Sequence, residues 1–175
     1  MTEEAGFAEL YQTHYRRVFG LCRQILGSTD HAEDAAQEVF MRAHRAFGSF
    51  DRAQSFAGWI LRIANNYCID IVRRRRKETQ IFGKESDERI EAEADRTNVL
   101  GELLTTERAH EVKAAVAALP ERYRIPLVLA YYSESSYADI AASLGITATH
   151  VATLIYRAKQ ALRRSLDQLE QESAA

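Results

Sequence analysis

Apolar side chains in the first 77 residues recur at the spacing of α-helices, in three segments separated by turn residues. The first segment meets Gly27, a natural helix end, and its apolar positions are Phe7, Leu10, Tyr11, Val18, Leu21, Cys22 and Ile25. The second follows the capping run Ser28-Thr29-Asp30 and ends at Gly48-Ser49. Its apolar positions are Ala32, Ala35, Ala36, Val39, Phe40, Ala43 and Phe47. The third follows Ser55, which can cap it, and its apolar positions are Phe56, Trp59, Ile60, Ile63, Ala64, Tyr67 and Ile71. Three such stripes predict a compact helical bundle.

The pattern weakens from about Lys77 to Thr106, where acidic residues cluster, and helical spacing returns over residues 107–170. We expect helices over residues 112–119 and 121–132. Pro120 and Pro126 then lie in or near a first turn, which tolerates proline because its N–H groups have no helical partner. No alternating β pattern of useful length occurs. The predicted fold is all-α, with two small helical domains joined by a flexible acidic linker: a three- to four-helix bundle over 1–77, the linker over 78–106, and a helix-turn-helix domain over 107–175.

Composition fits a globular protein, with 46% hydrophobic and 27% charged residues. No apolar run approaches the roughly 18 residues that span a bilayer, and the first residues are acidic where a secretory signal is basic. We therefore expect a cytoplasmic protein without membrane insertion. The two cysteines, Cys22 and Cys68, lack the short spacing of a zinc site, so no metal is expected, and we read them as buried thiols rather than as a redox pair.

The net charge of −2 divides unevenly along the chain. Residues 1–77 hold 12 Lys and Arg against 9 Asp and Glu, a net of +3, and residues 112–175 hold 7 against 6, a net of +1. Residues 78–111 hold 4 against 10, a net of −6, which conceals the two mildly basic ends. A local basic patch can bind DNA whatever the total charge, so nucleic acid remains a candidate partner.

Residues 137–156 have the features of a helix-turn-helix motif. Ala141 is small enough for the helix crossing, Gly145 suits the turn, and Thr147 can cap the second helix. The apolar anchors are Ile140, Leu144, Ile146, Val151 and Ile155. The candidates for the surface that faces the DNA groove are Thr147, Thr149, His150, Thr153 and Tyr156, followed by Arg157, Lys159, Arg163 and Arg164 as phosphate contacts. An ordinary pair of packed helices is the plainer alternative.

The third helix ends in five adjacent cations, Arg73-Arg74-Arg75-Arg76-Lys77, which suit a phosphate backbone, although a solvated helix end is the plainer interpretation. Its polar face offers Arg62, Asn65, Asn66 and Asp70. Nearby aromatics, Phe47, Phe50 and Phe56, suit unstacked bases but are also ordinary core residues. Opposite the apolar stripe of the second helix, the side chains of Asp34, Gln37, Glu38 and Met41 form a mixed acidic and apolar strip that suits a protein partner, unless it is simply a solvated face.

Four segments together resemble the extracytoplasmic-function (ECF) sigma factors of bacterial RNA polymerase, in the sigma-70 family. They are His31-Ala-Glu-Asp-Ala-Ala-Gln-Glu-Val-Phe40, Phe56-Ala-Gly-Trp-Ile-Leu-Arg-Ile-Ala-Asn-Asn-Tyr-Cys-Ile-Asp70, Leu119-Pro-Glu-Arg-Tyr-Arg124 and the helix-turn-helix. The resemblance implies that the first domain is region 2, which binds the polymerase clamp and melts the −10 element, and that the second is region 4, which reads the −35 element. It also implies promoter DNA and an anti-sigma factor as partners, with no cofactor and no catalysis.

Several residue roles are implied by the same resemblance. Asp34, Gln37 and Glu38, with Met41 beside them, fall on the polymerase-binding stretch. Arg62, Asn65, Asp70 and Arg73 fall on the promoter-melting helix, where we add Phe50, Asn66 and Arg74 as −10 contacts. Trp59 falls on a position that is mainly core. A flipped −10 base is expected to be held near residues 48–56.

The second helix of the motif departs from the family pattern. Where family members often show a run like Gly-Thr-Val-Lys-Ser-Arg-Leu, this chain has Thr149-His-Val-Ala-Thr-Leu-Ile155, so Ala152 and Leu154 stand in place of two cations. Since neither can make a bidentate contact to guanine, we expect weak −35 recognition. Two other functions remain open: a helix-turn-helix regulator that acts without polymerase, and a sigma mimic that only binds proteins. Nothing indicates an enzyme, because phosphate loops, nucleophile triads and paired carboxylates are lacking.

Overall fold

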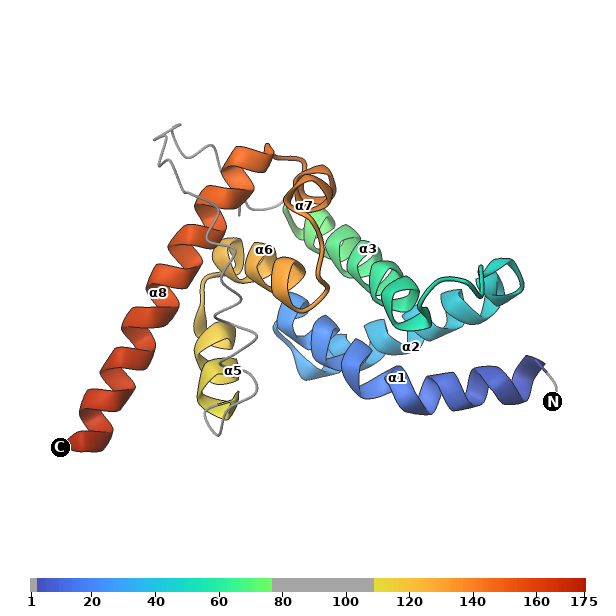
Figure 1. Ribbon diagram of the computed structural model, residues 1–175, viewed down its shortest axis with the longest axis horizontal. Coiled ribbons are helices and arrows are strands. Elements are labelled where there is room, and N and C mark those ends of the chain that lie inside the picture. The colour runs from blue at the N-terminus through green and yellow to red at the C-terminus, as the bar shows by residue number, and fades with distance from the viewer. Residues whose placement is uncertain (1–2, 77–108) are drawn as a thin grey trace. The chain divides into compact units, whose positions relative to one another are not determined.

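The computed structural model describes residues 3–76 and 109–175, and every regular element within these ranges is a helix (Figure 1). The chain divides into two compact units, residues 1–78 and 79–175. We call them unit 1 and unit 2 and describe each by itself. The linker predicted over 78–106 lies outside the described residues.

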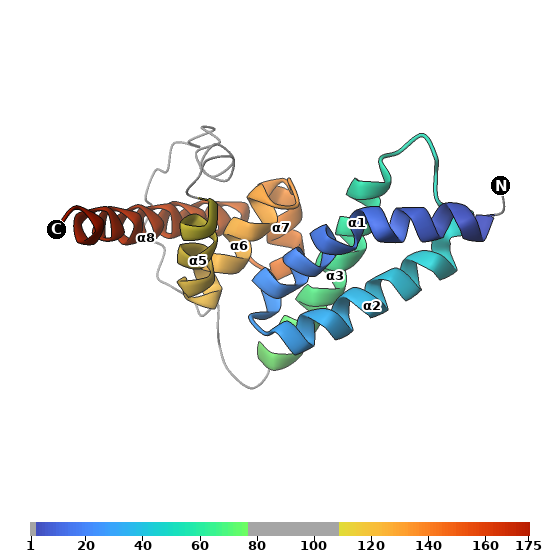
Figure 2. The same ribbon diagram turned by 90° about the horizontal axis from the view of Figure 1, so that it is seen from below.

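Unit 1 is a bundle of α1 (Glu3–Leu26), α2 (Thr29–Ala46) and α3 (Phe56–Arg76), with a 3₁₀ turn, η1 (Phe47–Ser49), after α2. The three helices pack against one another and lie side by side in both views (Figures 1 and 2). The predicted boundaries are confirmed: Gly27 has φ +74°, Ser28 Oγ accepts a hydrogen bond from His31 N at 3.5 Å, and Ser55 Oγ accepts one from Gly58 N at 3.4 Å.

The buried side of α3 differs from the predicted stripe. Phe56, Ile60 and Ala64 are buried as expected, but Trp59, Ile63, Tyr67 and Ile71 are only half-buried. The core instead takes up Leu61, Cys68, Ile69 and Val72. Apolar residues occur on nearly every side of α3, so helical spacing alone did not fix which of them faces α1 and α2.

Unit 2 consists of α5 (Ala109–Ala118), α6 (Glu121–Tyr131), α7 (Tyr137–Leu144) and α8 (Ala148–Ala174). Helices α5, α6 and α7 each pack on α8, the longest helix that the structure describes (Figure 2). Pro120 is the N-cap of α6, as its position predicts. Pro126 is the sixth residue of α6 and lies in the second turn, not in or near the first, where the helix buries it among Ile125 and Leu127.

Arg124 ties α5 to α6, because its Nη1 donates hydrogen bonds to the carbonyl oxygens of Leu119 at 3.0 Å and Ala117 at 3.5 Å. Partial burial, opposed in part by Glu121, lowers the pKa of this guanidinium. Arg124 therefore satisfies carbonyl groups that the end of α5 leaves without helical partners.

Within residues 3–76 and 109–175, no single helix is long and apolar enough to cross a membrane. One sharply bent pair, α7 with α8, meets that criterion by length and composition alone. Its large apolar residues Ile140, Leu144, Val151, Leu154 and Ile155 are buried inside unit 2.

Candidate nucleic-acid and partner-binding surfaces

The turn between α7 and α8 has the geometry that the sequence predicts for a helix-turn-helix. Gly145 adopts φ +68°, in the left-handed region that glycine occupies without steric cost. Ser136 Oγ caps α7 through Asp139 N at 3.1 Å, and Thr147 Oγ1 caps α8 through His150 N at 3.1 Å. Both caps hold the first turn of a helix in place, so α8 begins at a defined angle to α7.

The outward face of α8 consists of Thr149, Thr153, Tyr156 and Gln160, which recur every three or four residues opposite the buried Val151, Leu154, Ile155 and Ala158. Two of these side chains have internal partners. Thr153 Oγ1 donates to the carbonyl of Thr149 at 3.1 Å, and Gln160 Nε2 donates to the hydroxyl of Tyr156 at 2.8 Å. Because the Tyr156 oxygen already accepts, its own O–H remains the donor that the pair presents outward.

The sequence pointed to Tyr156 and to the basic residues after it as DNA contacts, but not to Gln160. The signal was available in principle, since Gln160 lies four residues after Tyr156 and shares its face. His150 and Arg157 flank this face, and both are half-exposed. Thr147 is exposed, but its hydroxyl oxygen serves as the helix cap.

Leu154 does not face outward, because only 1% of its surface is exposed and it belongs to the core of unit 2. The interpretation of Leu154 as a lost DNA contact is therefore wrong for this chain. Ala152, the other replaced position, is half-exposed and could carry a longer side chain. Lys159 makes a cation–π contact within unit 2, since its Nζ lies 5.1 Å from the centre of the Tyr131 ring.

One face of α3 carries the polar residues predicted for DNA. Arg62, Asn66, Asp70 and Arg73 are all exposed and lie four, four and three residues apart, which aligns them along the helix. Arg74 is exposed at the edge of this face, whereas Asn65 is half-buried on the other flank. We call the four aligned residues with Arg74 the α3 polar face.

The basic run at the end of α3 is not uniform. Arg75 Nη2 lies 3.2 Å from His31 Nδ1, and Arg75 Nη1 donates to the carbonyl of Leu26 at 3.5 Å, so this arginine joins α3 to the α1–α2 corner. Arg73 and Arg74 are exposed. Arg75 is half-buried and is used within unit 1, and the role of the run as a phosphate anchor stays a prediction.

An aromatic cluster surrounds the loop between η1 and α3. The Phe50 ring stacks on Phe47 with centroids 6.1 Å apart, and lies 4.7 Å from Trp59 and 5.7 Å from Phe56. Phe56 is buried, while Phe50 and Trp59 are half-buried and therefore partly open to solvent. Trp59 is thus only partly a core residue, and with Phe50 it offers ring surface to solvent beside the start of α3.

The strip on α2 is exposed as predicted for a partner surface. Asp34 and Gln37 are exposed, and half of the Met41 side chain is open to solvent (50%). Glu38 is half-buried and accepts a charge-assisted bond from Arg42 Nε at 2.8 Å, while the Arg42 guanidinium lies over the Tyr67 ring of α3 at 4.6 Å. Glu38 therefore helps to join α2 to α3 as well as bordering the strip.

Burial contributes to the shifted pKa values of three groups in unit 1: it lowers the pKa of His14 and raises those of Tyr15 and Cys68. The thiol of Cys68 has a raised pKa, because it shares a hydrogen bond with Cys22 and both are buried. Partial burial, with Arg17 nearby, lowers the pKa of His14, whose ring packs 5.2 Å from that of Phe56. Over the described residues, no cluster of three or more His, Cys, Asp and Glu side chains has the arrangement of a metal site.

Two family models match the chain, one in each unit. Sigma-70 region 2 matches residues 10–78, and sigma-70 region 4 matches residues 109–162. The first range contains the α2 strip and the α3 polar face, and the second contains the helix-turn-helix. These matches define a transcription initiation protein of the sigma-70 class.

Curated relatives and solved structures agree. The ECF RNA polymerase sigma factor SigW of Bacillus subtilis is 31% identical over 173 residues, covering 95% of this chain and 92% of SigW. SigE of Mycolicibacterium smegmatis is also 31% identical, over 95% of this chain and 63% of SigE. The sigma factor RpoE of Bartonella quintana, solved with the anti-sigma factor NepR, has the same fold with a TM-score of 0.58, at 21% identity, over 93% of this chain and 97% of RpoE. The chain belongs to the ECF sigma factors.

As a member of this family, the protein binds core RNA polymerase and directs transcription initiation at promoters. Sigma factors generally act by binding rather than by catalysis. The predicted family, fold class and function are thus confirmed, whereas the roles of individual residues stay predictions.

Proposed function

We propose that unit 1 binds core polymerase through α2 and the −10 element through α3, and that unit 2 binds the −35 element through α8. The corresponding domain bounds are 1–77 for region 2, 78–106 for the linker and 107–175 for region 4. The observation that carries the proposal is that each of these helices has a polar face opposite the apolar side that packs in the core, and this face is largely exposed on α2 and α3 and partly exposed on α8.

On α2, the polymerase-binding residues are Asp34, Gln37, Glu38 and Met41. Asp34 supplies a charge that attracts a basic partner, and Met41 supplies exposed apolar surface in the same strip. A charged group beside an adaptable apolar side chain is suited to a protein interface.

On α3 and the loop before it, the −10 contacts are Phe50, Arg62, Asn65, Asn66, Asp70, Arg73 and Arg74. The cations hold phosphates, while the half-exposed ring of Phe50 can stack on a base that has left the duplex. Residues 48–56 would hold the flipped base next to the aromatic cluster. Energy for melting comes from binding the separated strand, so no catalytic step is involved.

On α8, the −35 contacts are Thr147, Thr149, His150, Thr153, Tyr156, Arg157 and Lys159, to which the structure leads us to add Gln160. Hydroxyl and imidazole groups reach base edges or phosphates from the outward face, and the cations lie on its borders. Since Thr147, Thr153 and Lys159 have internal partners, we expect modest direct readout from this helix.

We also propose an anti-sigma factor as a regulatory partner. RpoE of Bartonella quintana was solved with the anti-sigma factor NepR. CnrH, which has the same fold with a TM-score of 0.53 at 22% identity over 95% of this chain and 91% of CnrH, was solved with the cytosolic domain of CnrY. Because polymerase and promoter DNA meet in the bacterial cytoplasm, we place the action of this protein there.

Binding of core polymerase by Asp34→Arg tests the proposal. Reversing this charge should weaken binding at least about tenfold, because like charges across an interface cost several kcal/mol. Glu9→Arg is the matched control, since Glu9 is an exposed carboxylate on α1 outside the strip. A thermal melt establishes that both variants fold.

Three results would contradict the proposal. Unchanged binding by Asp34→Arg would remove the role of the α2 strip. A footprint of the protein alone on duplex DNA, as a dimer and without polymerase, would favour an independent helix-turn-helix regulator. Tight partner binding with no transcription from any promoter would favour a sigma mimic.

A further inference from the structure

The two cysteines of the chain meet in the core of unit 1. Cys22 lies on α1 and Cys68 on α3, and neither has exposed surface. The thiol of Cys68 shares a hydrogen bond with Cys22. The sequence alone favours buried thiols over a redox pair, whereas the fold brings the two sulfurs into contact. Two thiols in contact have a reaction open to them that a single thiol lacks, because oxidation can join them.

Contacts on either side of the pair fix how α1 and α3 lie against each other. The ring of His14 on α1 packs 5.2 Å from the ring of Phe56 at the start of α3. Near the ends of the same two helices, the Leu26 carbonyl accepts a hydrogen bond from Arg75. The helices therefore run in the same direction. Both cysteines lie about two thirds of the way between these contacts, so the register of α1 and α3 brings them to the same level.

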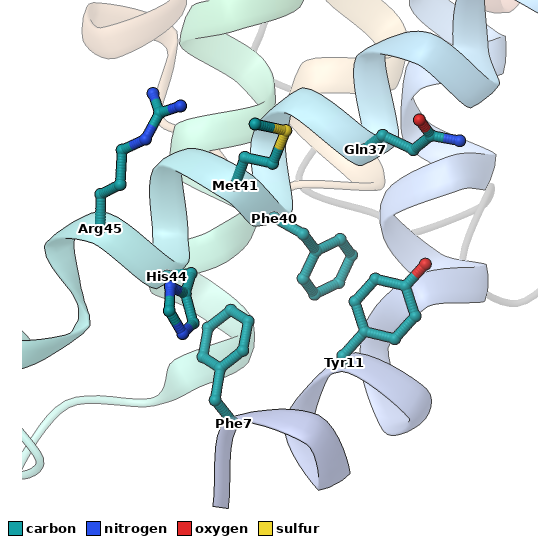
Figure 3. Close-up of a pocket in the computed structure, with 7 residues that line it drawn as sticks. All are labelled: Phe7, Tyr11, Gln37, Phe40, Met41, His44 and Arg45. Carbon is teal, nitrogen blue, oxygen red and sulfur yellow. The ribbon is translucent and has the colours of Figure 1, made fainter. Parts of the chain in front are cut away.

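The closed fold keeps oxidants away from the pair. A pocket of about 420 Å³ opens between α1 and α2, with Phe7, Phe40 and Met41 among its lining residues, but neither cysteine lines it (Figure 3). The hydrogen bond with Cys22, together with burial, raises the pKa of the Cys68 thiol. Because the thiolate is the reactive form, the pair stays reduced while unit 1 is closed. Oxidation requires a local opening of α1 from α3.

The hydrogen bond also sets the order in which the two sulfurs react. Because this bond raises the pKa of Cys68, Cys68 keeps its proton as the donor and the Cys22 sulfur accepts. Cys22 is therefore the sulfur that an entering oxidant meets as a nucleophile. Cys68 remains beside it as the second thiol.

We propose that Cys22 and Cys68 form an oxidative modification site, which hydrogen peroxide converts into a disulfide that cross-links α1 to α3 and stabilises unit 1. The Cys22 sulfur attacks the peroxide, the O–O bond breaks, and Cys22 becomes a sulfenic acid with release of water. The Cys68 sulfur then attacks the sulfenic sulfur, the S–S bond forms, and the hydroxyl leaves as a second water. Two thiols thus lose two electrons and two protons, and the peroxide is reduced to two waters.

The cross-link stabilises unit 1 without altering the surface assigned to DNA. It closes a loop that contains the whole of α2, and a disulfide across a long loop restricts the unfolded chain more than one across a short loop. Cys68 is buried, whereas Arg62, Asn66 and Asp70 of the α3 polar face are exposed. Since exchange with small thiols can break the bond again, the site protects unit 1 reversibly while peroxide is present.

Oxidation of the full-length protein by hydrogen peroxide, followed by peptide mass mapping and a thermal melt, tests this. A peptide that joins Cys22 to Cys68 should form, and dithiothreitol should separate it. The linked protein should melt about 10 °C or more above the reduced protein. Linking should be faster in urea too dilute to unfold unit 1, because local opening admits the peroxide. Binding of core polymerase should be the same for both forms.

The matched variants are Cys22→Ala and Cys68→Ala, each of which removes one sulfur and keeps a small buried side chain. Both should fail to form the linked peptide, and peroxide should not raise the temperature at which either melts. Met41, half of whose side chain is exposed, reports that the peroxide is active, because it should convert to the sulfoxide in every sample.

Three results would overturn the proposal. The first is a pair of thiols that stays reduced in dilute urea while Met41 is oxidised. The second is a disulfide between two copies of the chain instead of within one, since the register of α1 and α3 would then not govern the reaction. The third is a linked protein that melts below the reduced one or no longer binds core polymerase, because the bond would then distort unit 1.

Discussion

The two helices assigned to DNA, α3 in unit 1 and α8 in unit 2, differ in how their side chains are used. The α3 polar face ends in Arg73 and Arg74, both exposed, and lies beside an aromatic cluster. The outward face of α8 holds neutral residues, and Thr153 and Tyr156 are already hydrogen-bonded within the helix. The difference indicates that α3 combines charge with stacking surface, whereas the outward face of α8 offers weaker polar contacts and has its exposed cations, Arg163 and Arg164, one turn further along the helix.

The largest effect is expected from restoring the family's cations to α8. Leu154→Arg would place a charge in the core of unit 2, where 1% of the side chain is exposed, and should destabilise that unit by about 3 kcal/mol or more. Ala152→Lys, two residues earlier and half-exposed, should leave stability nearly unchanged and strengthen −35 binding. Thermal melts and promoter binding measure both.

If Leu154→Arg melts like the unaltered protein, α8 is not held as described and the contrast with α3 loses its basis. If Ala152→Lys leaves −35 binding unchanged, position 152 does not approach DNA. The pair therefore separates a change that the core forbids from one that the surface permits.

The next effect concerns the end of α3. Arg73→Ala with Arg74→Ala should reduce open-complex formation by about tenfold or more. It should also flatten the salt dependence: the slope of log K against log salt concentration should become shallower by roughly 0.7 per lost contact on single strands, or roughly 0.9 on duplex DNA. The measurement is open-complex formation by the holoenzyme over a range of salt concentrations. Lys113→Ala, an exposed cation on α5, is the control. An unaltered slope would mean that Arg73 and Arg74 are simply solvated.

The smallest effect is expected at the hydrogen-bonded pair on α8. Tyr156→Phe removes the outward O–H, and Gln160→Ala removes the group that orients it, so each should weaken −35 binding by about three- to fivefold, and the double variant by little more than either. Neither change removes a charge, so the salt dependence should stay as it is. Additive effects in the double variant, or normal binding by both, would contradict a joint role. Gln168→Ala, an exposed glutamine further along α8, serves as the control.

The fold was largely predictable because its boundaries depend on local chemistry. Ser28, Ser55 and Thr147 cap helices, and Gly27 and Gly145 take positive φ, so each boundary was available from a few neighbouring residues. Which side of α3 is buried was not predictable from the sequence, because Ile63 and Cys68 are both apolar. Only the packing of α3 against α1 and α2 decides that Cys68 is the buried one.

The surfaces were predictable in position but not in detail. The strip on α2 and the polar face of α3 followed from helical spacing. Arg75 could not be told from Arg73 and Arg74 within one basic run, because its partners Leu26 and His31 are distant in sequence. Leu154 was misplaced for a similar reason: alignment to a family pattern suggested an outward position, whereas α8 buries it. The pocket between α1 and α2 depends on tertiary packing and had no sequence signal.

We infer that α3, rather than α8, supplies most of the promoter specificity. The most direct test is transcription by the holoenzyme from promoters in which each base of the −10 and −35 elements is changed in turn. Single changes that remove specific contacts typically cost roughly 1–3 kcal/mol. We predict that the largest losses fall in the −10 element, with smaller losses throughout the −35 element. Larger losses from single changes in the −35 element would instead assign most of the specificity to α8 and overturn this inference.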